Sequence, residues 1–125
     1  MSLTAIRSDK LSPPVGPFSH AVRSGDLIFL SGQVGLDASG KLVGGGVTPQ
    51  AEQVFANLAA VLDSAGKSFA DVVRVGVFLT DISDFAALNA AYARFFTEPY
   101  PARTTVAVAA LPLGASVEID MVVKG

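Results

Sequence analysis

Cysteine and tryptophan are absent from the 125-residue chain, and histidine occurs once, at position 20. Without cysteine the chain has no disulfide bond and no zinc–thiolate centre. A single histidine excludes a His-x-x-x-His zinc motif and gives no basis for a serine–histidine–acid triad. Gly44-Gly45-Gly46 is not followed by the Lys-Ser/Thr of a phosphate-binding loop. We therefore expect neither metal nor cofactor, and interpret His20 as a structural or surface residue.

Charge is also scarce, at 16% of residues, against ~25% in a typical soluble domain. Half of the residues are apolar, and the mean hydropathy is +0.50. No stretch approaches the ~20 apolar residues of a membrane-spanning helix. Surplus apolar surface is then better buried between copies of the chain, so we expect a homo-oligomer and no membrane contact.

The net charge of −2 gives no general attraction to a polyanion, so nucleic acid is not an expected partner. The N-terminus has no charged leader followed by an apolar run, which favours a cytoplasmic location. The length predicts one domain spanning residues 1–125.

The first half of the chain predicts a hairpin and a long helix. Ala21–Arg23 and Asp26–Ser31 flank Ser24-Gly25, where glycine can supply the turn. Residues 36–46 are rich in glycine and predict a loop, with a short strand at 41–43. Thr48-Pro49 is typical of a helix start and Gly66 of a helix end. Between them, apolar residues recur at helical spacing: Ala51, Val54, Phe55, Leu58, Val61 and Leu62.

The second half predicts a strand, a helix and two further strands. Val72–Thr80 is the strongest strand pattern, with Val73, Val75, Val77 and Leu79 expected on one face. Ser83 is the expected cap of a helix that Glu98-Pro99 ends. Its apolar stripe comprises Phe85, Leu88, Tyr92, Phe95 and Phe96.

The remaining strands are expected at Thr104–Val108 and Ser116–Val123. In the last strand, Glu118, Asp120 and Val122 alternate with larger apolar residues, so the two sets point to opposite faces. The predicted order is β-hairpin-α-β-α-β-β, an α+β fold with two helices on one face of a mixed sheet. The other face needs a partner, and the residues alone do not distinguish two copies from three.

Arg103 and Glu118 are the charged residues whose positions point to chemistry. Arg103 precedes small β-branched residues, and a guanidinium binds a carboxylate through paired hydrogen bonds. A surface or interface arginine is the commoner explanation. Glu118 lies inside a half-apolar strand, where a carboxylate must be paired or used, unless that strand face is solvated. Because their strands are consecutive, we expect the two side chains to converge at one pocket.

Six segments form a recognisable series along the chain. They are Pro14-Val15-Gly16-Pro17-Phe18-Ser19-His20-Ala21-Val22, Phe29-Leu30-Ser31-Gly32-Gln33-Val34, Asn57-Leu58, Phe85-x-x-Leu88-Asn89-x-x-Tyr92, Pro101-Ala102-Arg103-Thr104-Thr105 and Leu111-Pro112-x-Gly114-Ala115-x-Val117-Glu118-Ile119. Together they resemble the reactive-intermediate deaminase (Rid) family, also called the YjgF or L-PSP endoribonuclease family, and they run in that family's order from about Pro14 to Val123.

This resemblance implies a chorismate-mutase-like fold, and a homotrimer whose sheets pack inward with clefts between adjacent subunits. It also implies hydrolytic deamination of reactive 2-enamine and 2-imine acids of the 2-aminoacrylate type, released by pyridoxal-phosphate enzymes, to 2-keto acids and ammonia. The expected ligand is therefore a small imino or keto acid, and no cofactor is needed.

The resemblance assigns roles residue by residue. Arg103 matches the arginine that binds the substrate carboxylate, and Glu118 matches the carboxylate that orients the attacking water. Thr105 matches a position whose backbone approaches the ligand.

Three further positions match residues that line or support the cleft. Ser31 and Asn89 are polar members of this set, and each is equally explained as structural support for the backbone. Phe18 replaces the tyrosine of many members, so a hydroxyl is lost and packing against the cleft wall is the expected role.

Two other functions remain open. The cleft could bind or sense a small carboxylate without catalysis, since Arg103 alone suffices for binding. An endoribonuclease or translation inhibitor is disfavoured by the negative net charge and the lack of an aromatic–basic RNA-binding motif.

Overall fold

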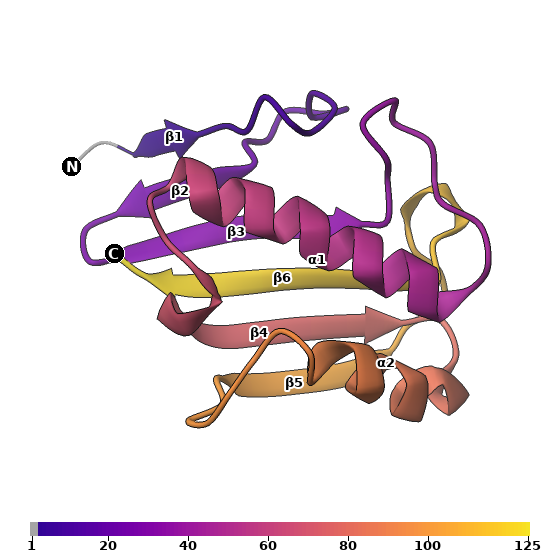
Figure 1. Ribbon diagram of the computed structural model, residues 1–125. Coiled ribbons are helices and arrows are strands. Elements are labelled where there is room, and N and C mark those ends of the chain that lie inside the picture. The colour runs from indigo at the N-terminus through magenta and orange to yellow at the C-terminus, as the bar shows by residue number, and fades with distance from the viewer. Residues whose placement is uncertain (1–2) are drawn as a thin grey trace.

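The computed structural model describes residues 3–125, in which one mixed sheet carries both helices on the same face (Figure 1). The strands are β1 (Thr4–Ile6), β2 (Ala21–Ser24), β3 (Leu27–Val34), β4 (Val72–Leu79), β5 (Ala102–Ala107) and β6 (Val117–Lys124). The helices are α1 (Val47–Ser64) and α2 (Phe85–Tyr92). The sheet order is β1-β2-β3-β6-β4-β5, with only the β4–β5 pair parallel. The predicted α+β fold class is confirmed.

The core lies between α1 and the centre of the sheet. All six apolar positions predicted for the first helix are buried. The alternate residues of β6 facing them are buried as well: Val117, Ile119, Met121 and Val123. Because successive residues of a strand point to opposite faces, Glu118 and Asp120 lie on the face away from the helices.

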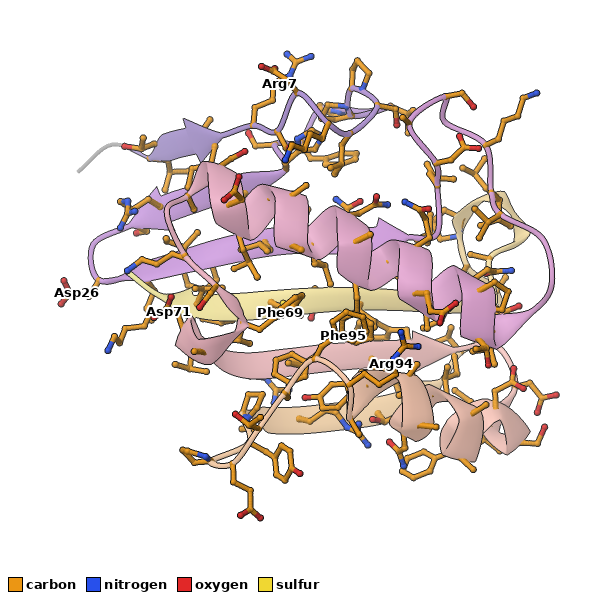
Figure 2. All side chains as sticks on the ribbon, viewed as in Figure 1. Arg7, Asp26, Phe69, Asp71, Arg94 and Phe95 are labelled. Atoms are coloured by element: carbon orange, nitrogen blue, oxygen red, sulfur yellow. The ribbon has the colours of Figure 1, made fainter. Side chains whose placement is uncertain are left out.

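An aromatic cluster joins α1 to the segment after α2. The ring of Phe55 stacks on Phe95 with centroids 4.4 Å apart, and Tyr92 stacks on Phe96 at 4.5 Å. Phe69 lies 5.6 Å from Phe95, and Figure 2 shows these two side chains close together below α1. Phe95 and Phe96 were expected inside the second helix. That helix ends at Tyr92, and both phenylalanines pack on the core from the turn that follows it.

β4 contains a β-bulge, so the predicted assignment of its residues to the two faces of the sheet is wrong at the start of the strand. Val72 pairs with Val123 and Arg74 with Val122, so Val73 is the extra residue. As a result Val72 is buried beneath the helices, whereas Val73, expected there, is exposed. Strict alternation holds only from Val75 onward.

The ends of the elements differ locally from the sequence prediction. The hairpin turn is Gly25-Asp26, because Ser24 already pairs with Leu27. The first helix begins at Val47 after Gly46, without a side-chain cap from Thr48. The carboxylate of Asp81, rather than Ser83, caps the short 3₁₀ turn before α2.

The end of α1 is as predicted. Gly66 has φ of 72° and donates its N–H to the Asp63 carbonyl, while Lys67 N–H reaches the Leu62 carbonyl. This pair of bonds is the glycine-terminated helix ending that a left-handed residue permits.

The sequence analysis missed β1 and placed a strand at 41–43 where only a Leu36–Leu42 bridge forms. β1 is three mostly exposed residues paired to β2, too short for an alternating pattern. No helix within residues 3–125 has both the length and the apolar character needed to cross a membrane.

Candidate functional site

Arg103 is held on the helix-covered face of edge strand β5. Its Nη2 donates a 2.7 Å hydrogen bond to Oδ1 of Asn89, on α2. The guanidinium carbon lies 4.6 Å from the ring centroid of Tyr92 and 5.7 Å from that of Phe85. Among residues 3–125 no carboxylate pairs with Arg103. The amide and two rings therefore orient a cation whose charge is uncompensated.

Two buried hydroxyls accompany this arginine. Tyr92 Oη and Thr105 Oγ1 are buried and have no hydrogen-bond partner within the described chain. Burial raises the pKa of the Tyr92 phenol, although the neighbouring Arg103 charge opposes this. We call Asn89, Tyr92, Arg103 and Thr105 the arginine cluster. The cluster offers a cation to a small ligand, while its two hydroxyl oxygens stay buried beside it.

Glu118 lies in a different place, on the wall of a cavity of about 280 Å³ at the ends of β3 and β6. Its walls include Val15, Phe18, Leu36 and Leu113. We call this space the glutamate cavity. Phe18 is half exposed and belongs to the wall, as expected for a ring without a hydroxyl.

The environment of Glu118 disfavours its charged form. Partial burial, reinforced by the charge of Asp120, raises the pKa of the Glu118 carboxyl above its ordinary value. A carboxylate with a raised pKa is a better proton acceptor, which suits a general base. Burial also raises the pKa of Asp120, while a Gly76 N–H hydrogen bond and the charge of Arg74 oppose that rise.

Ser31 and His20 hold the segment that forms one wall of the glutamate cavity. Ser31 Oγ donates to the Ser19 carbonyl at 2.6 Å. His20 is buried; its Nδ1 accepts from Ser8 N–H at 3.1 Å, and its Nε2 lies 3.3 Å from the Ser12 carbonyl. Ser31 therefore supports the backbone directly after Phe18, and the structural interpretation of His20 is confirmed.

The expected convergence of Arg103 and Glu118 is wrong within one chain. β4 lies between their strands. Arg103 pairs with Val75, on the helix-covered face, whereas Glu118 pairs with Phe78, three residues further on and therefore on the opposite face. The six predicted residues thus divide into two sets: Asn89, Arg103 and Thr105 in the arginine cluster, and Phe18, Ser31 and Glu118 at or beside the glutamate cavity.

Sequence reasoning missed two contributors. Tyr92 was assigned only to a helix stripe, but its ring lies against the Arg103 guanidinium. Gly32 was named only as part of a family-like segment, yet a methyl group there would overlap the Glu118 carboxylate. The proximity of Gly32 to a residue 86 positions away in the chain leaves no local pattern. Across residues 3–125 no three His, Asp or Glu side chains form a group able to hold a metal ion.

The fold and these two half-sites define a small α+β domain with an oriented guanidinium on one face of its sheet and a cavity bearing a carboxylate on the other. The profile of a family described as Endoribonuclease L-PSP matches residues 9–124, and the chain belongs to that family. It is 50% identical to Protein DfrA of Myxococcus xanthus, covering 98% of this chain and 95% of that protein.

It is also 42% identical to a 2-iminobutanoate/2-iminopropanoate deaminase of Dermatophagoides farinae, covering 98% of each chain. The solved structure of RidA from the Antarctic bacterium Psychrobacter sp. PAMC 21119 superposes with a TM-score of 0.93 at 46% identity. That alignment covers 98% of this chain and 99% of RidA. The resemblance read from the sequence is therefore confirmed.

Proposed function

We propose that the protein hydrolyses small 2-imino acids to 2-keto acids and ammonia. The observation that carries this proposal is the uncompensated, oriented guanidinium of Arg103. A planar guanidinium binds a carboxylate with two parallel charge-assisted hydrogen bonds, which fixes the atom attached to that carboxylate. In a 2-imino acid that atom is the electrophilic carbon. Relatives named 2-iminobutanoate/2-iminopropanoate deaminase support this choice of substrate.

The reaction needs only water and a proton acceptor. Water adds to the C=N carbon to give a carbinolamine, whose collapse breaks the C–N bond, releases ammonia and leaves a keto group. Glu118 holds the water and accepts its proton, a role that its raised pKa favours. The proton then passes to the leaving nitrogen, so the carboxylate is regenerated.

We further propose that the site forms between neighbouring subunits of a homotrimer. The arginine cluster and the glutamate cavity lie on opposite faces of one sheet, so a second copy must bring one to the other. Large apolar side chains on the helix-free face are partly exposed, among them Phe29 at 42% and Val106 at 40%. Packing the sheets inward would cover them, as the apolar composition also requires.

The direct test is imine hydrolysis. An amino-acid oxidase generates 2-iminopropanoate in the presence of semicarbazide, and semicarbazone formation is followed with and without the protein. The wild-type protein should suppress trapping, and Arg103→Ala should not. Lys41→Ala, an exposed cation in the loop before α1, is the matched control and should behave as wild type. If the wild-type protein leaves trapping unchanged while binding 2-oxobutanoate, the site is a carboxylate-binding module without catalysis.

A further inference from the structure

The walls of the glutamate cavity are mostly apolar. Val15, Phe18, Leu36 and Leu113 contribute apolar surface. The polar side chains His20 and Asn57 also line it, but their hydrogen bonds are already made within the protein. Both imidazole nitrogens of His20 contact backbone groups, and Asn57 Nδ2 donates to the Leu36 carbonyl at 2.9 Å. Of the polar side chains on its wall, only Ser12, Gln33 and Glu118 are left to bind a polar ligand group, and the rest of the wall is mostly apolar.

The cavity of the single chain is larger than the methyl side chain of the smallest imino acid. Its volume of about 280 Å³ is many times the space of one water molecule. The methyl group of 2-iminopropanoate would leave most of the apolar wall in contact with water. An isobutyl or benzyl group would displace that water, and each methylene so buried strengthens binding about fourfold.

The backbone of Leu113 is a second, independent indication that the glutamate cavity binds a ligand. Its backbone has φ of 61° and ψ of 18°, a left-handed conformation that is unfavourable for any residue with a Cβ. The side chain is 63% exposed, so burial in the core does not explain why a leucine occupies this position. Glycine would take this conformation without strain. Strain of this kind is found where a side chain serves a ligand, and this one lies at the glutamate cavity.

The geometry of an imine connects these observations. Its reacting carbon is trigonal and carries the carboxylate, the nitrogen and the side chain about 120° apart. With the carboxylate on Arg103 of one subunit and the water on Glu118 of another, the side chain is left to enter the space around Glu118. Resting on the proposed deaminase function, we infer that the glutamate cavity is a side-chain pocket selecting imino acids with branched or aromatic apolar side chains, with Leu113 as a specificity-determining residue.

The experiment compares kcat/KM for the imines of alanine, leucine and phenylalanine, each corrected for its uncatalysed hydrolysis. The wild-type protein should favour the leucine or phenylalanine imine over the alanine imine by about tenfold or more. Leu113→Ala should reduce that ratio about three- to fivefold. Leu3→Ala removes a leucine of similar exposure, 67%, outside the cavity, and should leave the ratio unchanged.

Leu113→Gly separates side-chain contact from backbone strain. It should reduce the ratio as Leu113→Ala does, while melting at a temperature equal to or above that of Leu113→Ala, since glycine relieves the strain. Acceleration of all three imines with equal kcat/KM, or with preference for alanine, would overturn the specificity inference and leave the deaminase function standing. Acceleration of none would overturn both.

Discussion

The carboxylate of Glu118 occupies space that remains open only because residue 32 is glycine. A Cβ added at Gly32 would overlap Glu118 Oε2 and press on its Cδ and Cγ. The two residues lie on neighbouring strands β3 and β6, and Gly32 falls inside the irregularity between Leu30 and Gln33. Gly32 thus fixes where the carboxylate of Glu118, the proposed proton acceptor, lies.

Gly32→Ala should therefore lower kcat about ten- to a hundredfold, because the flexible carboxylate must move and a displaced catalytic group loses its alignment. The thermal midpoint should change little, since the end of the Glu118 side chain can yield. The measurement is steady-state imine hydrolysis alongside thermal unfolding. Gly44→Ala, where an added methyl meets nothing within 4 Å, is the control. A folded Gly32→Ala protein with wild-type kcat would contradict the role assigned to Glu118.

The aromatic ring of Tyr92, rather than its hydroxyl, should set carboxylate affinity. The ring contacts the Arg103 guanidinium, whereas the hydroxyl has no partner among the described residues. Tyr92→Leu should raise both KM and the Kd for 2-oxobutanoate about fivefold, equivalent to a cation–π contact of ~1 kcal/mol. Tyr92→Phe keeps the ring and should stay within about twofold of wild type. Equal losses in the two variants would instead assign the effect to the hydroxyl.

Asp120 should control the acidic limb of the pH–rate profile. Catalysis requires ionised Glu118, so kcat/KM falls as pH drops through its raised pKa. Asp120→Asn removes the like charge and leaves only burial to raise that pKa, so the midpoint of the acidic limb should move to lower pH. Asp63→Asn, at an exposed position of α1, is the matched control. An unmoved midpoint would show that Asp120 does not act on Glu118.

The same pKa shift has a consequence for folding. A carboxyl whose pKa is higher in the folded than in the unfolded chain contributes stability that is complete below the unfolded pKa and is lost as pH rises through the folded one. The melting temperature of Asp120→Asn should therefore fall less between acidic and neutral pH than that of the wild-type protein.

Much of the fold follows from periodicity in the sequence. The alternation in β6 and the helical spacing in α1 gave correct faces because each element packs against one continuous core. Val73 was misplaced because a bulge depends on how two strands pair. Phe95 was misplaced because burial after a helix resembles burial inside one. The sequence named the candidate site residues. It did not show that they lie on two opposite faces of the sheet, because that depends on the order of the strands.

Mixed assemblies test that division. Arg103→Ala and Glu118→Gln subunits, each inactive alone, should regain about one quarter of wild-type activity when dissociated and reassembled in equal amounts. In an equal mixture, the subunit that supplies Arg103 to a cleft is intact there half of the time, and so is the neighbour that supplies Glu118. One cleft in four is therefore complete, for any number of subunits in the assembly. Mixing Arg103→Ala with the double variant Arg103→Ala/Glu118→Gln should restore nothing. Recovery no greater than the sum of the separate variants would refute a shared cleft.

With the cleft shared between subunits as proposed, the opposite placement of Arg103 and Glu118 also ties total activity to the amount of protein. A chain that holds only half a site contributes nothing until it meets another copy, so at low expression each added molecule raises total turnover more than the one before it. Once assembly saturates, turnover becomes proportional to the amount of protein. Dilution alone would then inactivate the protein, without any inhibitor or any change in its sequence.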